Sequence, residues 1–295
     1  MTAPRIVLVA KRSLYGRYVE DEDDPRVRQL LRRRDRSVAH WRAAHDEHTR
    51  TLDALVRELD RLGAHVLRIH HPGVRFDPTD AVLVVTVGGD GTLLAASHNV
   101  RSVPIFGVNS APRFSVGSYC AARRSTLKRM LPAALEGKLS SVRLTRMRVA
   151  VNGRTRSRRI LNEALYCHAS PAATSRYILS HGRITEDHRS SGFWIGPAAG
   201  SGGAQRSAGG KLLPLDSSDL QCVVREPYAA FGQSYRLRRV VVKAGQELTA
   251  KSKMHDGRMF LDGPYKQLSF RLGDVASFTA DGQPLTVLGL KQRRR

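Results

Sequence analysis

The sequence predicts an α/β amino-terminal domain over residues 1–120 and a β-rich carboxy-terminal domain over residues 121–295. In the first part, short apolar runs alternate with amphipathic stretches, which is the pattern of strands joined by helices in a mostly parallel sheet. In the second part, short alternating segments are separated by Asn-Gly and Asp-Gly pairs, which favour tight hairpins. The pattern leaves open whether the last residues return to the first domain.

The first domain is expected to contain four strands and two helices. Apolar residues at helical spacing predict a helix over residues 41–62, and Gly63 is a natural stop. A second helix is expected over residues 92–98, with Thr92 as its cap. The expected strands are residues 6–10, 64–69, 81–87 and 103–108. The run 81–87 is rich in Val, as is typical of a strand covered on both faces.

The second domain is expected to be built of short strands. These are predicted over residues 142–151, 160–168, 177–181, 237–243, 247–253, 258–261, 267–272 and 275–280. Hairpin turns are expected at residues 152–153, 256–257, 262–263 and 281–282. The Gly/Ala/Ser-rich segment 192–210 has two interpretations, a backbone that passes close to a ligand or a flexible linker.

Charge and composition narrow the class of protein. Lys and Arg number 49 against 26 Asp and Glu, a net charge of +23, with arginine clusters at residues 32–34, 156–159 and 293–295. No nucleic-acid-binding motif accompanies this charge, so we interpret it as solvated surface that steers anionic ligands and expect no nucleic-acid partner. Without a signal peptide or a membrane-spanning apolar run, the protein is expected to be cytoplasmic. Its three scattered cysteines are expected to be buried thiols.

The sharpest local signal is a glycine turn between the run 81–87 and the helix that follows. It comprises Gly88, Gly89, Asp90, Gly91 and Thr92. Glycines allow a tight turn whose N–H groups face phosphate oxygens, and the helix start adds a favourable dipole. Asp90 is suited to hold a metal ion or to accept a proton from an attacking hydroxyl. The alternative is an ordinary strand-to-helix turn with Asp90 as a turn former.

Several motifs, in order along the chain, resemble those of NAD kinases. The GGDGT sequence of residues 88–92 resembles the nucleotide-binding motif shared by NAD kinases, diacylglycerol kinases and sphingosine kinases. Residues 104–109, with Pro112 and Gly117, resemble the PVIGVN segment of NAD kinases, and residues 161–164 resemble their NE motif. Residues 190–192, 200–201 and 225–227 look like the mitochondrial-type variant. Lys11, His45 and His48 also stand in similar places.

The resemblance implies an NAD kinase-like fold and the transfer of a phosphoryl group from ATP, with Mg²⁺ or another divalent cation, to the 2′-hydroxyl of NAD(H). It makes Asp90 the candidate base and Gly88, Gly89, Gly91 and Thr92 the phosphate-binding residues. The implied NAD-binding residues are Asn162, Glu163, Ser191, Gly192, Gly200 and Ser201. No metal ligand is assigned, and a homodimer is expected. From the residues alone, Asn162 and Glu163 fit a surface turn equally well.

The chain also departs from the family pattern. Family members have a threonine-rich loop with an aromatic residue where this chain has Pro, Ala and Gly at residues 197–204. Two other functions therefore remain open. One is a superfamily kinase that acts on a lipid or another hydroxyl acceptor, and the other is a degenerate nucleotide-binding regulator whose basic surface binds nucleic acid. The sequence does not decide between ATP and polyphosphate as donor, or between NAD and NADH as acceptor.

Overall fold

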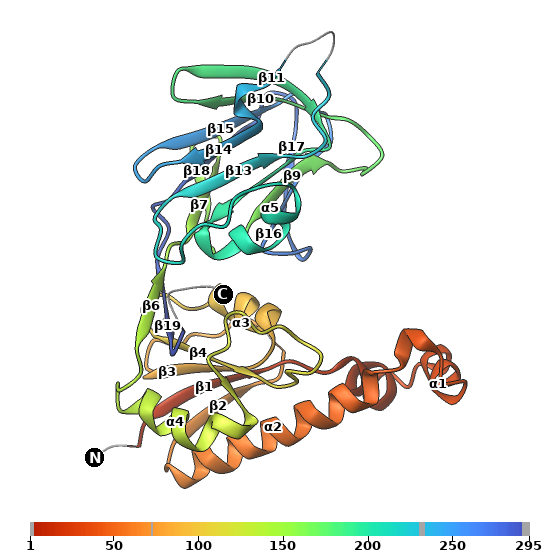
Figure 1. Ribbon diagram of the computed structural model, residues 1–295, viewed down its shortest axis with the longest axis vertical. Helices are drawn as coiled ribbons and strands as arrows, with labels where there is room; N and C mark the ends of the chain where they lie inside the picture. Colours follow the sequence, from red (N-terminus) through yellow and green to blue (C-terminus); the bar gives the residue numbers. More distant parts are fainter. Residues whose placement is uncertain (1–2, 72, 230–233, 291–295) are drawn as a thin grey trace. The chain divides into compact units, whose positions relative to one another are not determined.

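The computed structural model describes residues 3–71, 73–229 and 234–290, in two compact units. Unit 1 contains the described residues up to Val142 and those of 286–290, and unit 2 contains Arg143–Leu285. Unit 1 is an α/β structure and unit 2 is built mainly of antiparallel strands (Figure 1), which confirms the predicted fold class. The arginine cluster at residues 293–295 lies outside the described residues.

The sheet of unit 1 has the order β2-β1-β3-β4-β19-β6, with β5 beside β4. Its strands are β1 (Arg5–Ala10), β2 (His65–Ile69), β3 (Leu83–Gly88), β4 (Ile105–Asn109), β5 (Ala122–Arg123), β6 (Ser141–Leu144) and β19 (Leu285–Leu288). Strands β1 to β4 pair in parallel, and β19, from the far end of the chain, pairs in parallel with β4. All six residues of β3 are buried, which explains why Thr86 is its only polar side chain.

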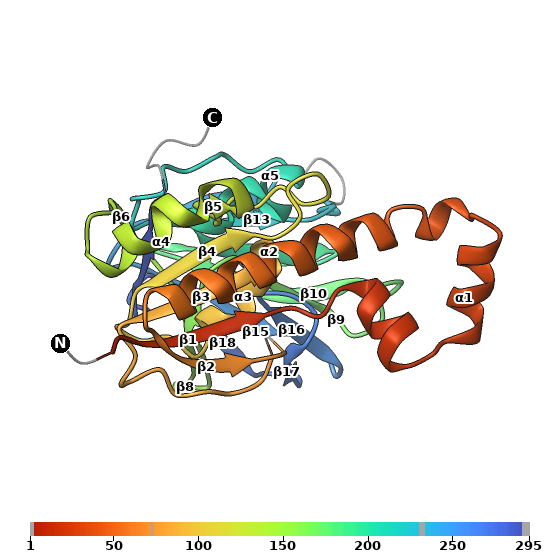
Figure 2. The same ribbon diagram turned by 90° about the horizontal axis from the view of Figure 1, so that it is seen from below.

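The described residues of unit 1 contain four α-helices. They are α1 (Pro25–Arg32), α2 (Trp41–Arg61), α3 (Asp90–Ser97) and α4 (Leu127–Leu135), with a π-helical turn, η1 (Gly16–Asp21), and short 3₁₀ turns η2 (Arg36–Val38) and η3 (Arg124–Thr126). Helices α2, α3 and α4 cover the sheet, whereas α1 lies beyond the end of α2, away from the sheet. Figures 1 and 2 show α2 and α4 on one face and α3 on the other. Leu55 of α2 and Leu131 of α4 pack with Val85 of β3 in the core of that first face.

The start of α3 corrects one expectation. The helix begins at Asp90, and its N-cap is Gly89, which makes no side-chain capping bond. Thr92 was expected to cap the helix, but it lies inside the first turn and is buried. The chain enters the helix two residues earlier than predicted because Gly89 already has the extended backbone of an N-cap, at φ −114° and ψ −163°.

Unit 2 contains two six-stranded antiparallel sheets, of order β11-β10-β15-β18-β7-β8 and β14-β13-β12-β9-β16-β17. Their strands are β7 (Met147–Val151), β8 (Arg154–Ile160), β9 (Ala164–His168), β10 (Ser175–His181), β11 (Ile184–Ser190), β12 (Phe193–Pro197), β13 (Leu220–Val224), β14 (Arg239–Val242), β15 (Glu247–Ser252), β16 (Gly257–Leu261), β17 (Lys266–Phe270) and β18 (Val275–Thr279). Phe193 joins the two sheets: its ring stacks on Tyr166 and meets the edge of Phe278.

Two of the four expected hairpin turns form. Residues 152–153 connect β7 to β8, and residues 262–263 connect β16 to β17. The other two expectations are wrong, because residues 256–257 lead into β16 from a strand of the other sheet and residues 281–282 lead from β18 toward β19. The linker interpretation of residues 192–210 is also wrong. This segment contains β12, a central strand, followed by a 3₁₀ turn, η4 (Ala198–Gly202), and helix α5 (Ala204–Ser207).

The three cysteines are free, but only Cys222 is fully buried, whereas Cys120 and Cys167 are partly exposed. The expectation of three buried thiols is therefore confirmed for Cys222 alone. None of the helices in the described ranges is both long and apolar enough to cross a membrane.

Candidate functional site

The predicted glycine turn connects β3 to α3 at the carboxyl edge of the parallel sheet. A side chain on Gly88 would place Cβ 2.0 Å from Oγ1 of Thr92, and one on Gly89 would place it 2.4 Å from Oγ of Ser115. Packing therefore explains Gly88, where an added Cβ would also stand 2.7 Å from the Cβ of Thr92. At Gly89, by contrast, the Ser115 hydroxyl could rotate away. Gly91 differs, because it is exposed, has no positive φ and has open space where a Cβ would stand. The fold gives no reason for Gly91, and its N-terminal helical turn is open to a ligand.

Asp90 holds the loop that follows β4. Its Oδ2 accepts the N–H of Ser118 at 2.9 Å and its Oδ1 accepts the N–H of Tyr119 at 2.7 Å. Asn109, the last residue of β4, fixes the same loop by donating to the carbonyl of Ser115 at 3.0 Å. A carboxylate has about four lone-pair sites, so the two bonds leave Asp90 able to accept further hydrogen bonds. The side chain is thus held in place with acceptor capacity to spare.

In unit 2, Asn162 and Glu163 lie in the short connection between β8 and β9. The Asp262 carboxylate accepts three backbone N–H groups from this connection, those of Leu161 at 2.9 Å, Asn162 at 2.7 Å and Glu163 at 3.1 Å. Asp262 in turn donates its N–H to the Glu163 carbonyl at 2.9 Å. This role was not predicted from the sequence, where Asp262 is recognisable only as part of a hairpin turn.

Glu163 is a buried acid with an unused oxygen. Its side chain is 8% exposed, and Oε2 has no hydrogen-bond partner within the described part of the chain. The pKa of Glu163 is raised from 4.5 to about 7, first by burial and then by the Asp262 carboxylate, while a hydrogen bond from Asn162 acts in the opposite direction. A buried, unpartnered carboxyl oxygen is suited to a hydroxyl donor from a ligand. This arrangement makes the surface-turn interpretation of the pair wrong.

The Gly/Ala-rich loop lies against the same connection. A Cβ on Gly200 would stand 1.7 Å from the Asn162 carbonyl oxygen, so the two backbones are in close contact. Ser201 differs from expectation. Its hydroxyl is fully buried, donates to the Ala198 carbonyl at 2.7 Å and accepts the N–H of Leu213 at 2.9 Å. The Ser201 side chain therefore braces the loop from inside.

Ser191 and Gly192 are placed elsewhere. Ser191 donates its N–H to the Arg225 carbonyl at 3.1 Å, where β11 turns into β12. Gly196, four residues beyond Gly192, is the part of β12 that approaches the Asn162 carbonyl. Four residues of strand span about 13 Å. The structure thus gathers Asn162, Glu163 and Gly200, and sets Ser191 and Gly192 at the other end of β12.

Comparison with known proteins identifies the family. A family model described as the ATP-NAD kinase N-terminal domain matches residues 2–138. A probable NADH kinase of Oryza sativa subsp. japonica is 34% identical over 231 residues, which cover 71% of each chain. An NADH kinase of Arabidopsis thaliana is 35% identical over 245 residues, 73% of this chain and 76% of that protein.

The chain belongs to the NAD kinase family. This confirms the family predicted from the motifs. Mitochondrial NAD kinase 2 of Homo sapiens is a more distant relative of this family member, 32% identical over 142 residues, 45% of this chain and 31% of that protein.

Two solved structures share the fold of this NAD kinase family member. An NAD kinase from Archaeoglobus fulgidus in complex with ATP has a TM-score of 0.65 at 20% identity, covering 98% of this chain and 94% of that one. A yeast NADH kinase complexed with NADH has a TM-score of 0.71 at 10% identity, covering 99% and 85%. At these identities the likeness concerns the fold alone.

Proposed function

We propose that the protein transfers the γ-phosphoryl group of ATP to the 2′-hydroxyl of the adenosine ribose of NAD(H), giving NADP(H). Family membership supports this reaction, and the open glycine turn with its anchored aspartate is the structural observation that carries it. Phosphoryl transfer depends mainly on positioning and charge neutralisation, so the donor substrate would be ATP with its Mg²⁺. Among the described residues no three His, Cys, Asp or Glu side chains gather as a metal site.

In this proposal, unit 1 binds the donor phosphates. The N–H groups of Gly89, Asp90 and Gly91 at the start of α3 offer hydrogen bonds and a positive dipole end to phosphate oxygens. The N–H of Thr92 instead donates to the Gly89 carbonyl at 3.0 Å. Exposed Gly91 lets the ligand approach the backbone closely. Asp90 would accept the proton of the 2′-hydroxyl, using the lone pairs that Ser118 and Tyr119 leave unused.

Unit 2 would recognise the dinucleotide. The Asn162 amide can donate to and accept from a purine edge, and Oε2 of Glu163 can accept a ribose hydroxyl. Gly200 would contribute by allowing the loop to approach these residues, whereas Ser201 would act through the loop backbone. Ser191 and Gly192 would serve a part of the dinucleotide remote from Asn162.

The branch of the family, the acceptor preference and the assembly are also proposals. The motifs at residues 190–192 and 225–227 favour the mitochondrial type, and the plant relatives named as NADH kinases favour use of NADH as well as NAD. We expect a homodimer. Light scattering after gel filtration tests the assembly, and the ratio of kcat/KM for NADH and NAD tests the preference.

The test of the reaction is a turnover assay on the purified protein. ATP or polyphosphate is combined with NAD or NADH, with and without Mg²⁺, and an NADP-specific dehydrogenase detects the product. The proposal predicts NADP(H) with ATP and Mg²⁺. ATP binding without NADP(H) from either acceptor would contradict it and would favour a kinase for another hydroxyl compound, or a degenerate regulator.

A further inference from the structure

A lysine at the carboxyl edge of the unit 1 sheet has no ion-pair partner among the residues that the structure describes. Lys11 directly follows β1, and its N–H donates to the carbonyl of Val87 at 3.2 Å. The residue after Val87 is Gly88, where the glycine turn begins. We propose that the Lys11 ammonium binds a phosphate group of the donor nucleotide. This assignment rests on the proposed function and adds a phosphate-binding residue outside the glycine turn.

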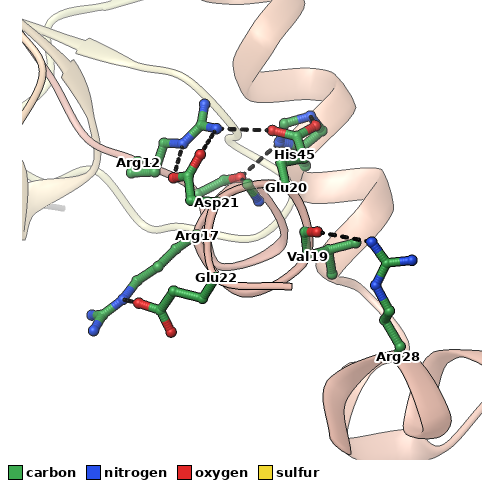
Figure 3. Close-up of polar contacts among 10 residues, drawn as sticks. Arg12, Arg17, Val19, Glu20, Asp21, Glu22, Arg28 and His45 are labelled. Atoms are coloured by element: carbon green, nitrogen blue, oxygen red, sulfur yellow. Dashed lines mark hydrogen bonds and ion pairs between the residues drawn. The ribbon is translucent and has the colours of Figure 1, made fainter. Parts of the chain in front are cut away.

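The acidic residues that follow Lys11 in sequence are already paired with arginines, as Figure 3 shows. Arg12 binds Asp21 through Nε at 2.7 Å and Glu20 through a terminal nitrogen at 3.1 Å. Glu20 also meets Nε2 of His45 at 3.2 Å, and Arg17 binds Glu22 at 2.8 Å. These pairs fix η1 against α2. They also use the local carboxylates, so the nearest acidic segment of the chain does not neutralise Lys11.

The ammonium of Lys11 is therefore a half-buried charge without a counter-ion. Within the ranges that the structure describes, no carboxylate forms an ion pair with Lys11. Burial lowers the pKa of Lys11, which shows that the protein interior disfavours its charged form. An uncompensated cation lowers the stability of the free protein, and a bound anion would remove that cost. A structural lysine would be expected to have such a partner within the fold.

Polar groups without partners accompany Lys11. His48 of α2 is 5% exposed, and its Nδ1 has no hydrogen-bond partner among the described residues. Burial first, and then the charge of Lys11, lower the pKa of His48 to about 4, while a hydrogen bond to the Lys11 backbone acts in the opposite direction. The ring is therefore neutral near pH 7, its single N–H is used by that bond, and Nδ1 is left as an acceptor. Ser110 is fully buried, and its N–H donates to the Gly88 carbonyl at 2.9 Å. Its hydroxyl likewise has no hydrogen-bond partner among the described residues.

The position of Lys11 favours the donor phosphates over another anion. Burial and the Asp90 carboxylate raise the pKa of Cys120 to about 12, while Lys11 acts in the opposite direction, so both charges lie within electrostatic reach of the Cys120 thiol. Lys11 is thus on the same edge of the sheet as the open first turn of α3. A lysine ammonium is a compact point charge that suits phosphate oxygens. The pyrophosphate of NAD(H) is the competing source of such oxygens.

The experiment compares Lys11→Met with the wild-type protein and with Lys138→Met. Lys138 is an exposed lysine of unit 1 that pairs with Glu136 at 2.6 Å, so its replacement removes the same charge without touching the proposed site. Isothermal titration calorimetry measures the Kd of ATP with Mg²⁺, of adenosine, and of NAD. Urea denaturation without ligand measures the free energy of unfolding.

We expect Lys11→Met to raise the Kd of ATP about 30-fold or more, the scale of losing one partner of a desolvated charge pair. The Kd of adenosine should change less than about threefold, and Lys138→Met should bind ATP as the wild type does. The urea midpoint of Lys11→Met should rise, because a buried uncompensated charge has been removed.

The proposal would be overturned if Lys11→Met and the wild type had the same ratio of ATP affinity to adenosine affinity. It would also be overturned if Lys11→Met lost affinity for NAD alone. A lower urea midpoint with unchanged ATP affinity would show a purely structural lysine. These outcomes are distinct from a failure of the proposed function, which would show as ATP binding by the wild type without NADP(H) formation.

Discussion

Replacement of Gly200 by Ala tests whether the close approach of the loop to Asn162 organises the acceptor site. In the structure, the added Cβ would stand 1.7 Å from the Asn162 carbonyl oxygen, 2.4 Å from its carbonyl carbon and 2.9 Å from its Cα. Cβ atoms essentially never approach other atoms closer than 3.0 Å, so the two backbones must separate by about 1.3 Å. No flexible side chain can absorb this shift, because all three atoms belong to the backbone.

This separation should change both the stability of the protein and its catalysis. Overpacking of this kind costs about 1 to 3 kcal/mol of unfolding free energy. A displacement of about 1 Å in a substrate-positioning residue reduces catalysis by about 100-fold, so kcat/KM for NAD(H) should fall by that order. The Kd of ATP should be unchanged, because the glycine turn belongs to unit 1. Urea denaturation, steady-state kinetics with varied NAD(H), and calorimetry with ATP measure the three quantities.

Gly203→Ala is the matched control for stability in the same loop. Its Cβ would be 3.5 Å from the nearest atom, the Gly200 carbonyl oxygen, which is an ordinary contact. Its unfolding free energy should stay within about 0.5 kcal/mol of the wild type. If Gly200→Ala were as stable as Gly203→Ala and kept wild-type kinetics, the inferred role of the close contact would be refuted.

Three further predictions concern the two units. Asp90→Asn should lower kcat by about 100-fold through loss of the base. It should also lower unfolding free energy by about 1 to 2 kcal/mol, because the Asn NH2 group would replace one of the two carboxylate oxygens that each accept a loop N–H; near-wild-type turnover would exclude Asp90 as the base. Gly91→Ala should raise unfolding free energy by about 0.5 to 1 kcal/mol, since Ala is the better helix former. The same change should raise the Kd of ATP about tenfold, and an unchanged ATP affinity would show that no ligand needs this glycine. In the folded state the pKa of Glu163 is raised from 4.5 to about 7. Between these two pH values the folded protein therefore binds more protons at Glu163 than the unfolded protein does. The contribution of Glu163 to stability is lost as the pH rises through this range, by about 3 kcal/mol in all. The difference in unfolding free energy between Glu163→Gln and wild type should therefore increase from pH 4.5 to pH 7, and a difference independent of pH would contradict the raised pKa.

Local sequence signals were sufficient for the turn that carries Asp90. The Val-rich run before Gly88 is typical of a strand covered on both faces, and glycines mark where it turns into a helix. The same reasoning located α2, whose apolar residues keep helical spacing from Trp41. The start of α3 was placed two residues too late because the N-cap is a glycine rather than Thr92.

The rest depends on residues that are far apart in the sequence. Strand β8 was missed because it is rich in exposed arginines, which a strand tolerates at the edge of a sheet. Asp262 is about 100 residues from the Asn162 connection that it holds, so only the pairing of β16 with β9 reveals its role. The motif also could not show that the Ser201 hydroxyl is used inside the loop, because its partners are set by tertiary packing.

The most direct test follows the phosphoryl group itself. The wild-type protein is incubated with ATP labelled at the γ-phosphate, Mg²⁺ and NAD or NADH, and the labelled product is located by ³¹P NMR. An NADP-specific dehydrogenase then identifies it, by reduction of the product formed from NAD or by oxidation of the product formed from NADH. The proposed function predicts one 2′-phosphorylated dinucleotide for each ADP formed, with the rate strongly reduced in Asp90→Asn. Label released only as inorganic phosphate, or transferred to no position of the dinucleotide, would contradict the proposed NAD(H) kinase activity.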